Sequence, residues 1–170
     1  MCGRHNRTLS TLERTSYIQA ARIVMTVDKP LDFRDLHGVL MLGDLTAGMY
    51  RINNVIDMLH LVQKPFPLPD KIEKLVSEMN CAYRDMLQCK EARDPVELQL
   101  ELWCVAARLR CIRPFDRGTT RLSNLLLGQM RLAQGFPFLS EEFSLETFYL
   151  FRQRYQVEHQ ECYPKMKSAA

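Results

Sequence analysis

The sequence predicts an all-α domain with one small β-hairpin. Apolar residues recur at helical spacing along most of the 170 residues. A helix-start signal at Asp94-Pro95 and a helix stop at Gly135 frame the central part of the chain. Hydrophobic residues make up 46% of the chain and charged residues 25%, which is ordinary for a globular protein with one buried core. We therefore expect a single domain.

Two helices are expected before residue 42. Ser10 or Thr11 is a good N-cap for a first helix that reaches about Val27, where the sequence Asp-Lys-Pro at 28–30 ends it. A second helix begins at about Asp32. Its apolar stripe consists of Phe33, Leu36, Leu40 and Met41.

The pattern changes after the second helix. Residues 43–48 form a loop, and residues 49–62 are short, partly β-branched and interrupted by Asn53-Asn54. That composition favours an irregular β-hairpin over a helix. Three prolines at 65, 67 and 69 then require an extended segment.

Four further helices are expected in the rest of the chain. The third runs from about residue 70 to 87 and carries a stripe of apolar residues. The fourth, from Pro95 to Ile112, is apolar on more than one face, which predicts a buried central helix. The fifth runs from about 119 to 134, and a sixth extends from about Ser140 to His159.

Composition favours an intracellular protein without a nucleic-acid or membrane partner. The formal net charge is +3, and the basic residues are scattered rather than grouped, which is typical of a mixed, solvated surface. No apolar run approaches membrane-spanning length, and the N-terminus lacks a secretory signal pattern. The six cysteines show no zinc-like spacing, so we expect reduced thiols and a cytoplasmic location.

The candidate site is the loop between the fourth and fifth helices. It runs Ile-Arg-Pro-Phe-Asp-Arg-Gly-Thr-Thr-Arg over residues 112–121 and ends at a helix N-terminus, where backbone N–H groups favour an anion. The candidate anion- or nucleotide-binding residues are Arg113, Arg117, Gly118, Thr119, Thr120 and Arg121.

This loop resembles the motif of Fic (Fido-fold) domains, His-Pro-Phe-x-Asp/Glu-Gly-Asn-Gly-Arg-x-x-Arg. The chain matches that motif at Pro114, Phe115, Gly118 and Arg121. It departs from the motif at the catalytic His (Arg113), the acidic metal ligand (Arg117), the Asn (Thr119), the second Gly (Thr120) and the last Arg (Asn124). The loop is therefore similar to a Fic loop in which the catalytic and metal-binding side chains have been replaced.

Flanking segments extend the resemblance in the same order. They include Leu36-His37 in the second helix, the sequence Ala-Gly-Met-Tyr-Arg at 47–51, the opening of the fourth helix and the end of the fifth. The resemblance implies a Fic-like core over residues 31–137, preceded by a helix and lead-in over 1–30 and followed by a helix and tail over 138–170, within one domain. It also implies that the hairpin is a flap, with Tyr50 and Arg51 positioned to contact a target.

Fic enzymes transfer part of a nucleotide, usually AMP from ATP, onto a target hydroxyl. The His acts as general base, and the acidic residue holds magnesium. Arg113 cannot accept the hydroxyl proton, because a guanidinium stays protonated, and Arg117 would repel magnesium. We therefore expect a degenerate Fic-like domain that lacks adenylyl transfer and has no certain catalytic residue. It would bind a protein partner or an anionic ligand, with ATP or another nucleotide as the candidate and magnesium not expected.

Several alternatives stay open at the level of sequence. The arginines either converge on one anion site or turn outward and pair with carboxylates such as Asp116. Tyr50 and Arg51 either contact a target or anchor the base of the flap. The chain could also be an active transferase with a non-standard loop, or a structural protein. If it is a bacterial effector, the cytosol in question is that of a host cell.

Two further residues bear on these alternatives. His37 is interpreted as structural. Some Fic proteins carry an inhibitory helix with the pattern Ser/Thr-x-x-x-Glu-Gly/Asn. Glu13 lies in the corresponding region, but Leu9 and Arg14 break the pattern around it, so no inhibitory helix is expected.

Overall fold

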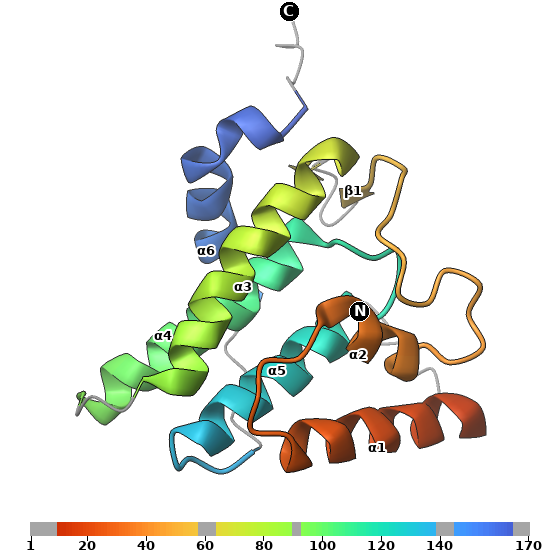
Figure 1. Ribbon diagram of the computed structural model, residues 1–170. Helices are drawn as coiled ribbons and strands as arrows, with labels where there is room; N and C mark the ends of the chain where they lie inside the picture. The colour runs from red at the N-terminus through yellow and green to blue at the C-terminus, as the bar shows by residue number, and fades with distance from the viewer. Residues whose placement is uncertain (1–9, 58–63, 90–92, 139–144, 165–170) are drawn as a thin grey trace, which may run out of the picture.

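The computed structural model describes residues 10–57, 64–89, 93–138 and 145–164, and this part of the chain is mainly helical (Figure 1). The α-helices are α1 (Thr11–Thr26), α2 (Phe33–Leu40), α3 (Ile72–Gln88), α4 (Pro95–Ile112), α5 (Thr119–Ala133) and α6 (Leu145–Glu158). Short 3-10 turns lie at Pro69–Lys71 and Gln160–Cys162. The six helices expected from the sequence are confirmed, although residues 140–144 of the sixth lie outside the described residues.

Helix starts follow the capping residues of the sequence. Ser10 and Glu13 form a capping box, in which the Glu13 N–H donates to Ser10 Oγ at 3.2 Å and the Ser10 N–H donates to Glu13 Oε2 at 2.9 Å. Asp32 accepts from two backbone N–H groups at the start of α2, and Asp94 does the same at the start of α4. Gly135 has φ +77 just beyond α5, as a helix stop requires.

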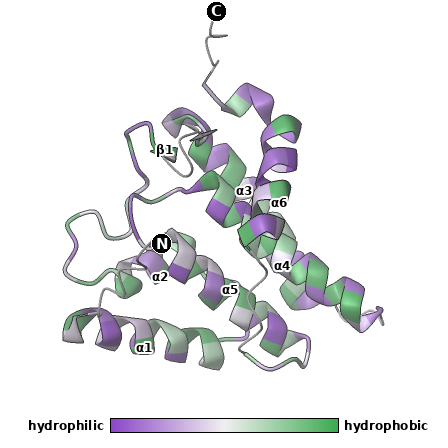
Figure 2. Ribbon diagram, turned by 180° about the vertical axis from the view of Figure 1, so that it is seen from behind, coloured by the Kyte–Doolittle hydropathy of each residue, from purple (hydrophilic) through white to green (hydrophobic). Residues whose placement is uncertain are grey.

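α4 lies at the centre of the fold, as its apolar faces predict. It packs against α5, α3 and α6, while α1 packs against α2 and α5. Leu102, Leu109 and Ile112 of α4 are fully buried, and Trp103 is 6% exposed. Figure 2 shows hydrophobic residues along α3, α4 and α5, where these helices meet. The layer of α3, α4 and α5 therefore supplies most of the core and holds the two ends of the candidate loop.

The expected β-hairpin over residues 49–62 is not seen. Among the described residues, the only strand pairing joins Ile56–Asp57 (β1) to Lys64–Pro65 (β2), antiparallel, and residues 58–63 lie outside the described part of the chain. The physical reason lies at Arg51, whose N–H donates to Pro114 O at 2.9 Å. Because this backbone group bonds to the loop after α4, it is not available for a strand partner. The described strand pairing therefore starts inside the expected hairpin and ends beyond it, and residues 58–62 of that hairpin lie outside the described part of the chain.

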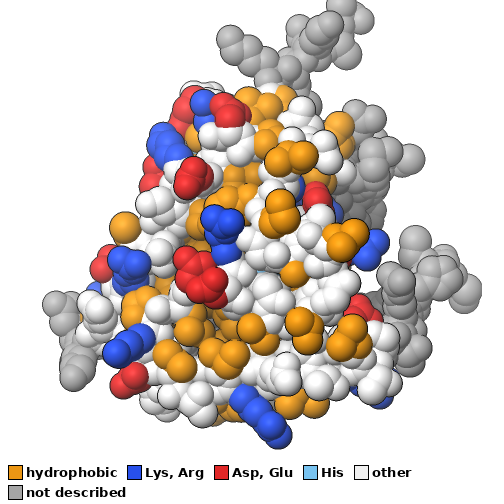
Figure 3. Space-filling model, turned by 45° about the vertical axis from the view of Figure 1, so that its right-hand side comes forward, with side chains coloured by type: hydrophobic (Ala, Val, Ile, Leu, Met, Phe, Trp, Pro, Cys, Tyr) orange, Lys and Arg blue, Asp and Glu red, His pale blue; other side chains and the backbone are white. Residues whose placement is uncertain are grey.

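The surface is mixed, as the charge pattern predicts. On the face drawn in Figure 3, Lys/Arg and Asp/Glu side chains alternate with hydrophobic ones, and no block of one charge is visible. No helix within the described ranges is both long and apolar enough to cross a membrane.

Candidate functional site

The candidate loop begins with a strained residue. α4 ends at Arg113, whose φ of +47 and ψ of +63 place it in the left-handed region. Arg113 is the only residue other than glycine with a positive φ among the described residues. For a residue with a Cβ this conformation costs about 1–2 kcal/mol, so the surroundings must hold it in place.

Arg51 holds the start of this loop. Its guanidinium is buried, since the residue is only 3% exposed. It donates to Arg113 O at 2.7 Å, Asn53 O at 2.7 Å and Pro67 O at 2.6 Å. The bond to Arg113 O places a cation at the C-terminal end of α4, where the helix dipole favours positive charge. Burial lowers the pKa of Arg51, and the neighbouring charge of Arg113 lowers it further.

His37 holds the end of the loop. It is 2% exposed, and its ring stacks on Phe115 with centroids 3.8 Å apart. Nδ1 accepts from the Gly48 N–H at 2.9 Å, which leaves Nε2 to donate to Arg117 O, also at 2.9 Å. Both nitrogens are thus used by a neutral ring, and burial lowers the pKa of His37. The interpretation of His37 as structural is consistent with this geometry.

Gly118 brings the loop close to α2. Its φ is +76, and a Cβ added there would lie 2.7 Å from Met41 Sδ and 3.2 Å from His37 Nε2. A glycine is therefore required both by the backbone angle and by the packing.

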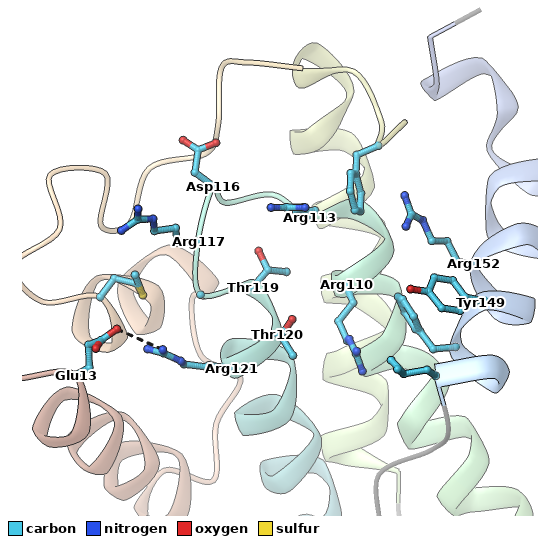
Figure 4. Close-up of a pocket in the computed structure, with 15 residues that line it drawn as sticks. Glu13, Arg110, Arg113, Asp116, Arg117, Thr119, Thr120, Arg121, Tyr149 and Arg152 are labelled. Atoms are coloured by element: carbon cyan, nitrogen blue, oxygen red, sulfur yellow. Dashed lines mark hydrogen bonds and ion pairs between the residues drawn. The ribbon is translucent and has the colours of Figure 1, made fainter. Parts of the chain in front are cut away.

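The loop lines a cavity of about 560 Å³. The structure brings together on this cavity all six candidate residues, Arg113, Arg117, Gly118, Thr119, Thr120 and Arg121. Figure 4 shows that the opposite wall comes from α6, with Tyr149 and Arg152, and that Arg110 of α4 lies between the two walls. The described lining contains five arginines, at 110, 113, 117, 121 and 152, against two carboxylates, at 13 and 116.

Aromatic rings hold three of the arginines. The guanidinium carbon of Arg113 lies 5.0 Å from the centre of the Phe66 ring, and that of Arg152 lies 4.1 Å from the same centre. Arg110 lies 4.3 Å from the centre of the Phe148 ring. Attraction between a guanidinium cation and the face of an aromatic ring restrains the position of each of these side chains. These arginines are therefore partly ordered before any ligand arrives.

The arginines of the loop do not behave alike. No carboxylate within the described part of the chain lies within ion-pair distance of Arg113, and Asp116 points away from it in Figure 4. Arg117 is exposed and extends away from Arg113. Its charge contributes to the lowered pKa of Asp44, which is caused mainly by hydrogen bonds from Thr46. Of the two alternatives left open by the sequence, Arg113 therefore corresponds to an arginine that faces the cavity, and Arg117 corresponds to one that turns outward.

Arg121 and the two threonines complete the loop. Arg121 Nη2 lies 3.4 Å from Glu13 Oε1, so the first helix does contact the loop although its sequence lacks the inhibitory pattern. Thr119 is 7% exposed, and its hydroxyl donates to Phe115 O at 3.3 Å. Thr120 is exposed at the rim.

Tyr50 and Arg51 do not line the cavity. Tyr50 is half-buried and packs against Phe115 at a centroid distance of 5.4 Å, and burial raises its pKa. Arg51 is occupied by main-chain carbonyls. Their geometry corresponds to the second of the two roles left open above, that of anchoring the base of the segment.

Sequence reasoning missed part of the lining. These residues are Phe66, Arg110, Leu145, Phe148, Tyr149 and Arg152. Phe66 directly follows β2, Arg110 lies near the end of α4, and the others come from α6, so no motif connects them to the loop. Their position depends on how α6 packs against α4, which periodicity does not determine.

The lining does not fit a magnesium ion. Arg117 occupies the position of the acidic metal ligand, and cations outnumber carboxylates among the described lining residues. No group of three or more His, Cys, Asp or Glu residues in the described ranges is arranged to hold a metal. Phosphate or carboxylate suits the lining, because guanidinium groups and hydroxyls are donors for such anions.

Comparisons with known proteins agree with the fold. No protein-family model and no curated protein matches the sequence. Among solved structures, the chain is similar to a Fic domain-containing signaling protein from Bacteroides thetaiotaomicron, with a TM-score of 0.65 and 20% sequence identity. The similarity covers 86% of this chain and 58% of that protein, so the chain spans a little more than half of its length. The architecture of this chain is therefore that of a Fic domain.

Proposed function

We propose that this chain is a Fic-like domain that has lost ordinary adenylyl transfer and binds an anion in the arginine-lined cavity. The observation that carries the proposal is the place of Arg113. It stands at the motif position of the general base, lines the cavity and lies over the Phe66 ring.

Loss of transfer follows from the chemistry of this side chain. A guanidinium stays protonated and offers no lone pair for the proton of a target hydroxyl. General-base catalysis commonly contributes about 10²–10⁴ in rate, and no histidine lines the described wall of the cavity to supply it instead.

Anion binding is supported by the composition of the same wall. With five arginines and two carboxylates, the described lining carries a formal surplus of +3. Thr120 adds an exposed hydroxyl, and the first turn of α5 has no side-chain cap. The ligand is a phosphate-containing molecule such as ATP or another nucleotide, bound without magnesium, or a protein partner that presents an anionic group.

Calorimetric titration tests the binding. Pyrophosphate and ATP are titrated into the chain with EDTA and, separately, with magnesium. We expect binding in EDTA that falls roughly 10- to 100-fold in Arg113→Gln, since a charged hydrogen bond contributes about 1.5–3 kcal/mol. The matched control is Arg84→Gln, an exposed arginine of α3 outside the cavity, which should bind as the parent does. Absence of binding by both anions in both buffers would contradict the proposal.

Labelling tests the loss of transfer. The chain is incubated with ATP labelled at the α-phosphate, with magnesium and with candidate target proteins. We expect no covalent label. Label that disappears in Arg113→Ala would instead establish the alternative, an active transferase with a non-standard loop.

A further inference from the structure

We propose that Thr120 is a phosphorylation site, and that its phosphate fills the arginine-lined cavity and excludes other anions. This inference rests on the proposed function, because it treats the same cavity as an anion site. It adds a means by which that site is closed.

The two neighbouring threonines differ in a way that selects Thr120. The Thr119 hydroxyl is buried and already donates to Phe115 O. Thr120 is exposed, and its hydroxyl has no hydrogen-bond partner among the described residues. Both line the cavity, but only Thr120 presents an accessible hydroxyl to a modifying enzyme.

The surroundings of Thr120 favour a phosphate over a hydroxyl. Figure 4 shows Thr120 between Arg121 and Arg110, with Arg113 on the same cavity. Arg121 is already paired with Glu13, and Arg110 and Arg113 are the other cations on this side of the cavity that would attract the new charge. Thr120 is also the second residue of the fifteen-residue α5, where the helix dipole favours negative charge. A phosphothreonine carries about −1.5 to −2 charges at pH 7 and has three acceptor oxygens.

The modification is an ordinary phosphoryl transfer with ATP as the co-reactant and a protein kinase as the catalyst. The Thr120 oxygen forms a bond to the γ-phosphorus, the bond from that phosphorus to the bridging oxygen of ADP breaks, and the hydroxyl proton is released. Because the phosphate is then tethered beside the arginines, its effective concentration reaches the millimolar range or above. A free anion would have to compete with it.

Titration by ³¹P NMR tests whether the phosphate lies among the arginines. The full chain is prepared with phosphothreonine at 120, and a control chain carries phosphoserine at Ser77, an exposed α3 residue outside the cavity. The control should show the ordinary second pKa of about 6. The phosphate at 120 should titrate about one unit lower or more, and Arg113→Gln should reverse much of that shift. Equal titration of the two phosphates, or a chain unfolded by the phosphate at 120, overturns the inference.

Two further measurements separate this inference from the proposed function. Pyrophosphate should bind the unmodified chain and should bind the chain phosphorylated at 120 at least 10-fold more weakly. If the unmodified chain does not bind, the proposed function fails. If both chains bind equally, only the inference fails.

Treatment with a basophilic kinase and ATP should place phosphate on Thr120 and not on Thr119, as read by mass spectrometry. If Thr120→Val takes up as much phosphate from the kinase as the parent chain does, the inference is contradicted.

Discussion

Replacing Arg51 should destabilise the protein more than replacing any exposed arginine. Arg51→Met keeps the length of the side chain and its apolar stem but removes every N–H donor. The carbonyls of Asn53, Pro67 and Arg113 then lose donors at 2.6–2.7 Å. The arginine is 3% exposed, so water would not readily replace those donors.

The size of the effect follows from these three bonds. Leaving a buried acceptor without a donor costs about 1–3 kcal/mol. Three such acceptors, partly relieved by local relaxation, give a loss of roughly 3–5 kcal/mol in the free energy of unfolding. For a chain of this length that corresponds to a drop of roughly 6–20 °C in melting temperature. Arg51→Lys keeps the charge and one donor direction, so about half of the loss should remain.

Urea unfolding followed by circular dichroism measures the effect. Arg84→Met is the matched control, because Arg84 is an exposed residue of α3 and lies outside the cavity lining. It should change the free energy of unfolding by less than about 0.5 kcal/mol. If Arg51→Met costs less than about 1 kcal/mol, the carbonyl bonds do not hold the loop, and the reasoning from the geometry of Arg51 fails.

Three other predictions follow from the same loop. Arg113→Gly should raise the free energy of unfolding by about 1 kcal/mol in the same urea assay, because glycine adopts a φ of +47 without strain, while anion binding should weaken as in Arg113→Gln. A fall in stability would contradict this prediction. Gly118→Ala should cost roughly 1–3 kcal/mol, since its Cβ would crowd Met41; a neutral result would show that Met41 moves aside freely. The lowered pKa of His37 means that the unfolded chain takes up a proton that the folded chain does not, so stability should fall as pH drops below about 6.5, by at most about 1.4 kcal/mol per pH unit. His37→Asn should flatten this slope between pH 8 and 5, and an unchanged slope would assign it to other groups.

Much of the fold could be predicted from the sequence because its helices carry local signals. Ser10, Asp32 and Asp94 each cap the helix that follows them, and α4 is buried as its apolar faces require. The position of the strand pairing could not be predicted, because the backbone of Arg51 bonds to a residue more than sixty positions away. Composition describes local preference and carries no information about such a partner.

The candidate site also has one part that the sequence predicted and another part that it did not. The loop residues are contiguous, so the sequence placed them on one cavity without any knowledge of packing. The choice between an inward and an outward arginine needed coordinates, since Arg113 and Arg117 differ only in surroundings. The wall from α6 was not foreseen, because Arg152 reaches the cavity through the packing of α6 on α4.

The cavity joins Glu13 near one end of the described chain to Arg152 near the other. During synthesis, α6 leaves the ribosome after α1 through α5, because it is the last α-helix of the described chain. Before α6 has emerged, a nascent chain has the motif loop but lacks the far wall and the ring of Phe148. Ligand affinity should therefore arise only after translation has passed α6, and a pulse-labelled nascent chain would bind nothing until then.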